Sequence, residues 1–288
     1  MSAATEGRAR YLNAPRNTDH TIDQQWHAYT EAEHDRWNRL YAGAMEVLPG
    51  RACDAYMQAL DTLDLTGGIP DMAELSTRLQ KLTGWSVVPV HGLIPDDVFF
   101  DHLANRRFPA GAFIRTEAEM EYLEEPDVFH DIFGHVPLLA DPTYAAFLEA
   151  YGKGGARAMA EGRLKNLARL YWYTVEFGLI DTPDGLRIFG AGIMSSAAEC
   201  KFALEDPSPH RIRFDMERVM RTDYIIDDFQ QTYFVIDSFE ALLEECYKDF
   251  SPLYERLAGA TQIAPNDILR EDLVMTKGTL DYFTKGAA

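Results

Sequence analysis

Apolar positions along the chain repeat mostly with helical spacing, and several helices have recognisable starts. Thr30-x-x-Glu33 and Asp71-x-x-Glu74 match the capping box, in which side chains satisfy the backbone amides of the first helical turn. The second pattern leads into a helix that should end near Gly84. Asp141 and Pro142 predict an N-cap and a first-position proline, opening a helix that should end at the glycine cluster 152–155.

Short runs typical of strands lie between these helices, and Asp237 with Ser238 opens one more helix. The strand candidates are WSVVPV (85–90), GAFIR (111–115), LRIFG (186–190) and QTYFVI (231–236). They do not alternate regularly with the helices, which argues against a doubly wound parallel sheet. Repeats and proline- or serine-rich linkers are lacking. The pattern predicts a mainly α protein of the α+β class, folded as a single domain over residues 1–288.

Composition and charge narrow the classes of partner. The 288 residues are 47% hydrophobic, enough for a large core, and the net charge is −19. Such a surface repels phosphate backbones and anionic lipids, so neither nucleic acid nor membrane is an expected partner. The first residues, MSAATEGRARYLN, lack the apolar core of a signal peptide, and Cys53, Cys200 and Cys246 form no CxxC pair. These features predict a cytoplasmic protein.

Two histidines in the stretch EPDVFHDIFGHVPLLADP are the first candidates for chemistry. His130 and His135 stand five residues apart, which puts them about 140° apart around a straight α-helix. Gly134 and Pro137 indicate that the helix ends here, leaving His135 on the turn beyond it. The turn could bring both rings to one point. Taken alone, the spacing favours two ordinary structural histidines.

One carboxylate lies within the apolar helical stretch RLKNLARLYWYTVEFGLI (163–180). Apolar residues cover most of this helix, so Glu176 is expected to be buried. A buried carboxylate needs a cation, a strong donor or a proton. Arg169, seven residues earlier, is the ordinary candidate for that partner, and a metal ion is the alternative. Trp172, four residues before Glu176, would place an aromatic wall beside any ion held there.

Two imidazoles and one carboxylate form the ligand set of non-haem iron(II) oxygenases, and the same set binds catalytic zinc. Spacing does not separate the two metals. An oxygenase needs an apolar pocket that excludes water, and aromatic residues crowd the three candidate ligands. These aromatic residues are Phe129, Phe133, Tyr171, Trp172, Tyr173 and Phe177.

Three stretches together resemble the catalytic-domain signatures of the aromatic amino acid hydroxylases. They are EPDVFHDIFGHVPLL, LARLYWYTVEFGLI and FGAGIMSSAAE. The resemblance covers a catalytic core from about residue 30 to about residue 250 and is carried by three motifs in the family's order. It implies that His130, His135 and Glu176 bind Fe(II) and form the catalytic centre. It also implies dioxygen and a tetrahydropterin as cosubstrates.

The resemblance carries over further residues to the amino acid substrate. Arg115 matches the family arginine that pairs with the substrate carboxylate. Trp172 matches an aromatic residue that lines the pocket for the substrate ring. Ser195 matches a serine near the substrate and the first histidine, and Glu199 a glutamate of the inner polar network. Without the resemblance, these four residues would be interpreted as a strand-end arginine, a core tryptophan, a helix cap and a solvated carboxylate.

A second group matches the family's pterin site. In HGLIPDDVFFDHL (91–103), the backbone of Gly92, Leu93 and Ile94 would face the pyrimidine edge, and Phe99 would stack on the pterin ring. Asp131 stands where the family usually has a glutamate near the pterin. The aligned residues around the pterin and the iron also include Tyr171 and Tyr224.

Among the aromatic amino acids, the resemblance favours L-phenylalanine, hydroxylated to tyrosine. Family members that act on tyrosine have an acidic residue where this chain has Ile226, and tryptophan-specific members have phenylalanine in place of Trp172. Hydroxylation of tryptophan or tyrosine is the alternative, followed by a zinc hydrolase with the same ligands and by a non-catalytic aromatic-binding module. The chain resembles the short bacterial members, which implies a monomer without a regulatory domain.

Overall fold

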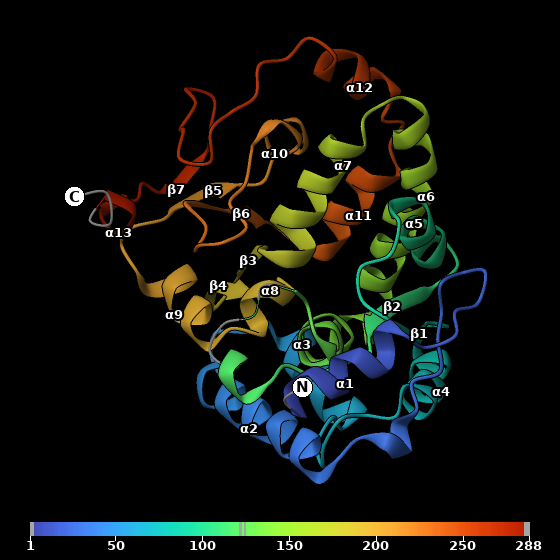
Figure 1. The fold of residues 1–288 in the computed structure, drawn as a ribbon. Helices are drawn as coiled ribbons and strands as arrows, with labels where there is room; N and C mark the ends of the chain where they lie inside the picture. Colours follow the sequence, from blue (N-terminus) through green and yellow to red (C-terminus); the bar gives the residue numbers. More distant parts are fainter. Residues whose placement is uncertain (1–2, 121–122, 124, 285–288) are drawn as a thin grey trace. The chain divides into compact units, whose positions relative to one another are not determined.

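The computed structural model describes residues 3–120, 123 and 125–284. The chain forms two compact units, each described here by itself. Unit 1 comprises Met1–Glu46 and Asp54–Ala156, and unit 2 comprises Val47–Cys53 and Arg157–Ala288. Helices dominate both units and the strands are short (Figure 1), so the predicted mainly α, α+β class is confirmed.

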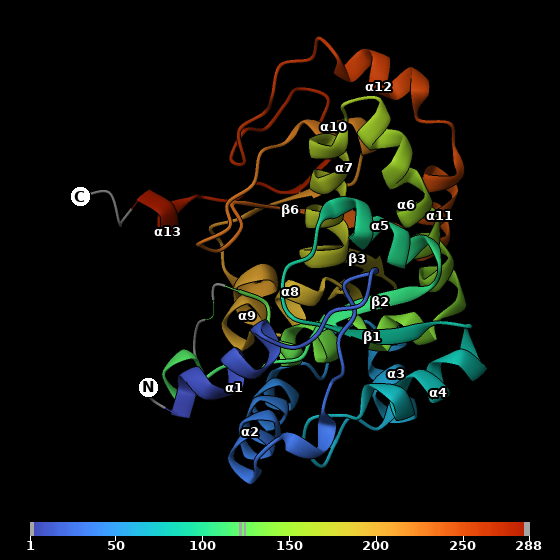
Figure 2. The same ribbon diagram turned by 45° about the vertical axis from the view of Figure 1, so that its right-hand side comes forward.

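Unit 1 consists of helices around one pair of parallel strands, β1 (Ser86–Val90) and β2 (Arg107–Gly111). Helix α4 packs on β1 and helix α5 on β2 (Figure 2). The strands run in register from Ser86 opposite Arg107 to Val90 opposite Gly111. The helical segments are α1 (Ala3–Leu12), η1 (Trp26–Ala28), α2 (Glu31–Val47), α3 (Asp54–Leu63), α4 (Met72–Leu82), α5 (Asp96–Ala104), η2 (Glu117–Glu119), η3 (Phe129–His135), η4 (Pro137–Ala140) and α6 (Pro142–Ala160).

The predicted helix starts of unit 1 are confirmed by their hydrogen bonds. The Glu33 amide donates to the Thr30 hydroxyl, and the Thr30 amide donates to the Glu33 carboxylate, which completes a capping box before α2. The Asp71 carboxylate accepts from two amides of the first turn of α4. Helix α4 ends at Leu82, two residues before Gly84, as its pattern predicts.

Helix α6 begins at Pro142 as predicted but does not end at the glycine cluster. It continues to Ala160 through Gly152, Gly154 and Gly155. A Cβ on Gly152 would lie 2.6 Å from the Leu103 Cβ, and one on Gly155 would lie 2.1 Å from the Phe100 ring. These two glycines therefore let α6 approach α5 closely, which is a packing role that the sequence does not distinguish from a helix end.

The predicted strand at 111–115 is wrong, because β2 ends at Gly111. The backbone beyond it remains buried but bonds to other partners. The Tyr29 hydroxyl donates to the Ala112 carbonyl, and the Phe113 carbonyl accepts from the Val128 amide. The Arg115 amide donates to the Asp127 carboxylate. Apart from one bond from the Ala112 amide to the Val90 carbonyl of β1, the apolar run is thus a buried segment tied to loops and side chains.

Unit 2 contains a five-stranded mixed sheet in the order β4-β3-β6-β5-β7. Strand β6 is parallel to both β3 and β5, and all five of its residues are buried. The strands are β3 (Leu179–Thr182), β4 (Gly185–Ile188), β5 (His210–Arg213), β6 (Thr232–Ile236) and β7 (Val274–Thr276). Of these, β4 and β6 match predicted runs, while β3, β5 and β7 were not predicted.

The helices of unit 2 lie in the chain before, between and after these strands. Helix α10 packs on α7, and the segment η5 contacts α8 and β6. They are α7 (Leu164–Tyr171), η5 (Trp172–Glu176), α8 (Ala191–Met194), α9 (Ala197–Glu205), α10 (Met216–Arg221), α11 (Phe239–Tyr247), α12 (Ser251–Leu257) and α13 (Asp281–Thr284). The Ser238 hydroxyl caps α11, which confirms that predicted start. Among the described residues, every helix is either too short or too polar to cross a bilayer.

Candidate active site

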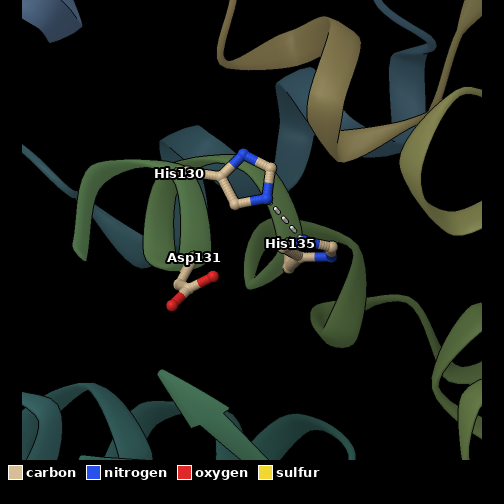
Figure 3. Close-up of side chains that lie close together, drawn as sticks. All are labelled: His130, Asp131 and His135. Atoms are coloured by element: carbon tan, nitrogen blue, oxygen red, sulfur yellow. Dashed lines mark hydrogen bonds between the residues drawn. The ribbon is translucent and has the colours of Figure 1, made fainter. Parts of the chain in front are cut away.

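His130 and His135 share one π-helical segment, η3, in unit 1. The prediction that the helix ends before His135 is therefore wrong. A π-helix closes its hydrogen bonds between residues five apart, so positions i and i+5 lie above one another. The two Nε2 atoms are 3.2 Å apart, and the rings meet nearly at a right angle (Figure 3). The wider helical turn removes the separation that a straight α-helix would impose.

Two side chains outside η3 hold its backbone in place. The buried Asp127 carboxylate accepts from the His130 amide at 3.0 Å, at the start of the segment. The Tyr56 hydroxyl, from α3, donates to the Phe133 carbonyl at 2.5 Å. Bonds of this kind satisfy backbone groups that a π-helix leaves outside the α-helical pattern. The orientation of the two histidines is therefore fixed from both ends of the segment.

The histidine pair fits a transition-metal ion. Two nitrogens bound at right angles to an ion, each at about 2.1 Å, lie about 3 Å from one another, close to the observed separation. His135 is buried and its ring lies against Phe108, with the ring centres 4.9 Å apart. His130 is half-buried. Neutral imidazoles in an apolar surrounding can bind iron as well as zinc, so the ligand types alone do not identify the metal.

Asp131 brings a carboxylate close to the same two rings. The ligand atoms of His130, Asp131 and His135 all lie within 4.8 Å of one another (Figure 3). One Asp131 oxygen accepts from the Gly111 amide at 2.7 Å. Because Gly111 pairs with Val90, this bond fixes Asp131 at the end of β1 and β2 from which residues 91–95 lead away. Asp131 and the predicted pterin residues Gly92, Leu93 and Ile94 therefore lie at this end of the strand pair.

Residues 91–95, which the sequence analysis assigned to a pterin loop, form the connection between β1 and α5. Gly92, Leu93 and Ile94 lie in it, and Leu93 is 76% exposed, among the most exposed large apolar side chains of the described residues. Phe99 is half-buried on α5, with its ring edge-on to that of Phe100. An exposed leucine and a half-buried phenylalanine offer apolar surface to a flat ring.

Arg115 is not the surface arginine that its position alone suggests, because it is only 7% exposed. Its Nε and Nη2 atoms donate to the two Asp127 oxygens at 2.8 and 2.9 Å. Burial by itself would raise the pKa of Asp127, but the Arg115 guanidinium and two backbone amides hold that pKa below its ordinary value. Arg115 is thereby held in one orientation, with Nη1 outside this two-point contact.

Glu176 ends the second π-helical segment, η5, in unit 2 and is half-buried. A Cβ on Gly190 would lie 2.4 Å from the Glu176 carbonyl oxygen, and one on Gly192 would lie 3.1 Å from it. The glycines of the FGAG signature therefore let the backbone pass directly against Glu176. Arg169, the ordinary candidate partner for Glu176, instead pairs with Asp223 and donates to Gln262.

Trp172 begins η5 and lies between two aromatic rings. The Tyr224 ring stacks on it with centres 4.3 Å apart and planes 15° apart, and the Phe177 ring lies 4.7 Å away. The indole N–H donates to the Gln230 Oε1 at 2.9 Å. Trp172 therefore forms an aromatic cluster with Tyr224 and Phe177. Tyr171 is the half-buried last residue of α7.

Ser195 and Glu199 lie at neighbouring helix ends. Ser195 follows α8, and its hydroxyl donates to the Ala191 carbonyl at 2.9 Å. Glu199 is buried in the first turn of α9, so the solvated carboxylate expected without the resemblance is wrong. The Tyr233 hydroxyl donates to it at 2.5 Å. Burial raises the pKa of Glu199 to about 7, although the bonds from Tyr233 and the Gln230 amide oppose that shift.

Several supporting residues were missed by the sequence reasoning. Asp127 stands three residues before His130, a spacing like that of a cap, and this signal could have been found. Tyr56, Gln230 and Tyr233 bond to residues that are 34 to 77 positions away along the chain. No local pattern indicates such partners.

A model of the biopterin-dependent aromatic amino acid hydroxylases matches residues 16–258 of this chain. The chain belongs to this family. Membership confirms the resemblance inferred from the three signatures.

Individual hydroxylases of known type are similar over nearly the whole chain. A phenylalanine-4-hydroxylase of Caulobacter vibrioides is 62% identical over 269 residues, covering 93% of this chain and 92% of that protein. The iron- and phenylalanine-bound crystal structure of phenylalanine hydroxylase from Chromobacterium violaceum is 49% identical, with a TM-score of 0.89, and covers 96% of this chain and 100% of that one. The structure of the same enzyme with bound oxidized Fe(III) has a TM-score of 0.91.

Proposed function

We propose that this hydroxylase converts L-phenylalanine to L-tyrosine, using dioxygen and a tetrahydropterin at a mononuclear Fe(II) site. The observation that carries the proposal is the pair of Nε2 atoms 3.2 Å apart on η3, in a chain of this family. The phenylalanine-4-hydroxylases of Caulobacter vibrioides and Ralstonia nicotianae, 62% and 53% identical, support phenylalanine as the substrate. The iron-bound relative supports the metal.

The proposed iron ligands are His130, His135 and Glu176. Iron, when bound, supplies the activation of dioxygen, and the protein supplies the ligand geometry, the binding of both organic substrates and the exclusion of water. Glu176 is preferred to Asp131 as the carboxylate ligand because one Asp131 oxygen already accepts from the Gly111 amide. Asp131 is assigned to the pterin.

The remaining residues are proposed to orient the two organic molecules. Arg115, held by Asp127, would bind the carboxylate of the amino acid, and the Trp172 wall would bind its ring. Ser195 and Glu199 would complete the polar side of this site. The proposed pterin residues are Gly92, Leu93, Ile94, Phe99, Asp131, Tyr171 and Tyr224.

Phenylalanine is preferred over tyrosine because the turn after Tyr224 presents Ile226, an apolar side chain that is 67% exposed. A phenol would gain no hydrogen bond from it. Hydroxylation of tryptophan or tyrosine by the same site is the alternative. We further propose that the enzyme acts as a monomer in the cytoplasm.

One assay tests the activity directly. The purified protein is supplied with Fe(II), tetrahydrobiopterin and oxygen, and each aromatic amino acid is offered in turn with product identification. Tyrosine formed from phenylalanine, absent without oxygen or without pterin, is the expected result. Conversion of tryptophan or tyrosine at a higher kcat/KM would assign a different substrate. Activity of the zinc-loaded protein without oxygen would contradict the oxygenase.

A further inference from the structure

We propose that Gln230 is a positioning residue for the aromatic substrate, acting through Trp172 and the turn that carries Tyr224; this inference rests on the proposed function. Gln230 is 2% exposed and lies two residues before strand β6. Its side chain joins two parts of unit 2 that are far apart in sequence, the segment η5 and residues 224–229.

The hydrogen bonds of Gln230 determine which way its carboxamide points. The Nε2 atom donates to the Ile225 carbonyl at 2.9 Å and faces the Asp228 carbonyl at 3.3 Å. Carbonyl oxygens only accept, so the NH₂ group must face them. The Oε1 atom is thereby directed at the Trp172 N–H, which only donates. The orientation of the amide follows from its partners, and no other side chain of this size satisfies all three groups.

This arrangement fixes the orientation of the indole ring within its plane. Stacking on Tyr224 leaves a flat ring able to slide or turn within its plane, because stacking energy varies little with such motion. One directional bond at the indole nitrogen removes that freedom. The same carboxamide holds the turn from which Tyr224 projects, so the two stacked rings are fixed relative to one another.

The turn is also held from its other end, independently of Gln230. The Asp223 carboxylate pairs with Arg169, and the Asp223 carbonyl accepts from the Tyr173 hydroxyl at 2.6 Å. The Phe229 ring stacks on Phe202, with centres 4.5 Å apart. Loss of the Gln230 side chain should therefore leave the turn folded while releasing the indole ring. A defect in substrate handling can then be separated from a defect in folding.

An indole that turns freely would bind the substrate ring in several orientations. A displacement of about 1 Å is enough to lower the rate of an oriented reaction by about a hundredfold. We expect Gln230→Met, which keeps the length of the side chain but loses both hydrogen-bonding ends, to raise the KM for phenylalanine about tenfold. The amount of tetrahydropterin oxidised per tyrosine formed should rise as well. Gln230→Glu should raise KM less, because its carboxylate still accepts from the indole N–H although it cannot donate to the two carbonyls.

The matched control is Gln231→Met, the same change one position later. Gln231 is half-buried, and its backbone carbonyl, instead of its side chain, accepts from the His210 amide. We expect a KM and a pterin-to-tyrosine ratio close to those of the unmodified enzyme. If this control shows the tenfold increase, Gln230 has no special role.

A double-mutant cycle with Trp172→Phe tests whether Gln230 acts through the indole. Phenylalanine has no N–H for Gln230 to hold, so Gln230→Met should change KM at least about threefold less in that background. If the KM changes caused by the two substitutions simply multiply in the double variant, Gln230 does not act through the indole and the proposal is overturned. An unchanged KM and pterin-to-tyrosine ratio in Gln230→Met would also overturn it, even if the melting temperature falls. If Gln230→Met does not fold, Gln230→Leu, which also loses both hydrogen-bonding ends, decides by the same criteria.

Tryptophan fluorescence provides a readout without turnover. Emission attributable to Trp172, obtained by subtracting the Trp172→Phe spectrum, should change in Gln230→Met and not in Gln231→Met. If the unmodified enzyme forms no tyrosine, the proposed function is wrong, and this spectral comparison still decides whether Gln230 orients the indole. An unchanged Trp172 spectrum would contradict the orienting role.

Discussion

The two π-helical segments lie in units that contain differently partnered buried acids, Asp127 in the first and Glu199 in the second. The histidine segment, Phe129–His135, is anchored by the buried ion pair of Asp127 with Arg115. The glutamate segment, Trp172–Glu176, lies in a unit that contains the buried acid Glu199, whose partners are a tyrosine hydroxyl and a backbone amide. A carboxylate paired with a guanidinium keeps its charge when buried, whereas one with neutral partners tends to gain a proton.

The difference predicts opposite responses to pH. The pKa of Asp127 lies below its ordinary value, so its stabilising effect is present above about pH 4 and is lost as the pH falls through the folded-state pKa. The pKa of Glu199 is raised to about 7, so its contribution is fully present below the unfolded-state pKa and is lost as the pH rises through 7. The first unit should weaken in acid and the second above neutrality.

The largest expected effect is on the proposed ligands. His130→Ala and Glu176→Gln should each lower tyrosine formation by at least about a hundredfold and reduce bound iron, because each removes a group that would bind the ion directly. Iron content and turnover are measured together. Asp131→Asn is the comparison: it should retain iron and raise the KM for the pterin. Loss of iron in Asp131→Asn with retention in Glu176→Gln would exchange the two assignments.

The next effect concerns the anchor of the histidine segment. Asp127→Ala should lower the free energy of unfolding by about 3–5 kcal/mol, because Arg115 would be left buried without its counter-charge. Glu117→Ala is the control, since Glu117 makes a similar two-point contact with Arg39 at the surface, where solvent screens the charges, and its loss should destabilise the protein far less. Denaturant unfolding compares the two. Equal losses in the free energy of unfolding would mean that burial does not strengthen the ion pair of Asp127 with Arg115.

Glu199→Gln should increase the stability of the folded protein by an amount that depends on pH. With a folded-state pKa of about 7 against an ordinary 4.5, the buried charge costs up to about 3 kcal/mol above neutrality. The variant should therefore gain stability over the unmodified protein as the pH rises from 5 to 8. Melting curves across this range measure the difference. Glu240→Gln, at an exposed position on α11, should have the same pH dependence of melting temperature as the unmodified protein. If the stability difference between Glu199→Gln and the unmodified protein does not change with pH, the effect of burial on Glu199 is contradicted.

The smallest effect is that of one hydrogen bond to η3. Tyr56→Phe should lower the free energy of unfolding by about 1 kcal/mol, because the Phe133 carbonyl loses its hydroxyl partner. Tyr41→Phe is the matched control, because the Tyr41 ring also lies edge-on to the Phe133 ring, with ring centres 5.5 Å apart. A weaker iron affinity in Tyr56→Phe alone would show that the bond also shapes the histidine pair.

Local patterns predicted the parts of the fold that local physics controls. The capping box at Thr30 and the caps at Asp71 and Ser238 start helices as expected, because their hydrogen bonds connect residues at most three apart. The glycines of α6 and the segment after β2 were misjudged for the opposite reason. Their conformation depends on contacts with α5, Tyr29 and Asp127, which the local sequence does not reveal.

The sequence by itself determined the family, the helix starts and the types of side chain available for chemistry. Only the tertiary structure decided that His130 and His135 meet on a π-helical turn, that Arg115 is buried against Asp127, and that Gln230 holds Trp172. The physical reason is range: propensity and capping act over a few residues, whereas a wider helical turn or a buried polar group is stable only where distant side chains satisfy its hydrogen bonds.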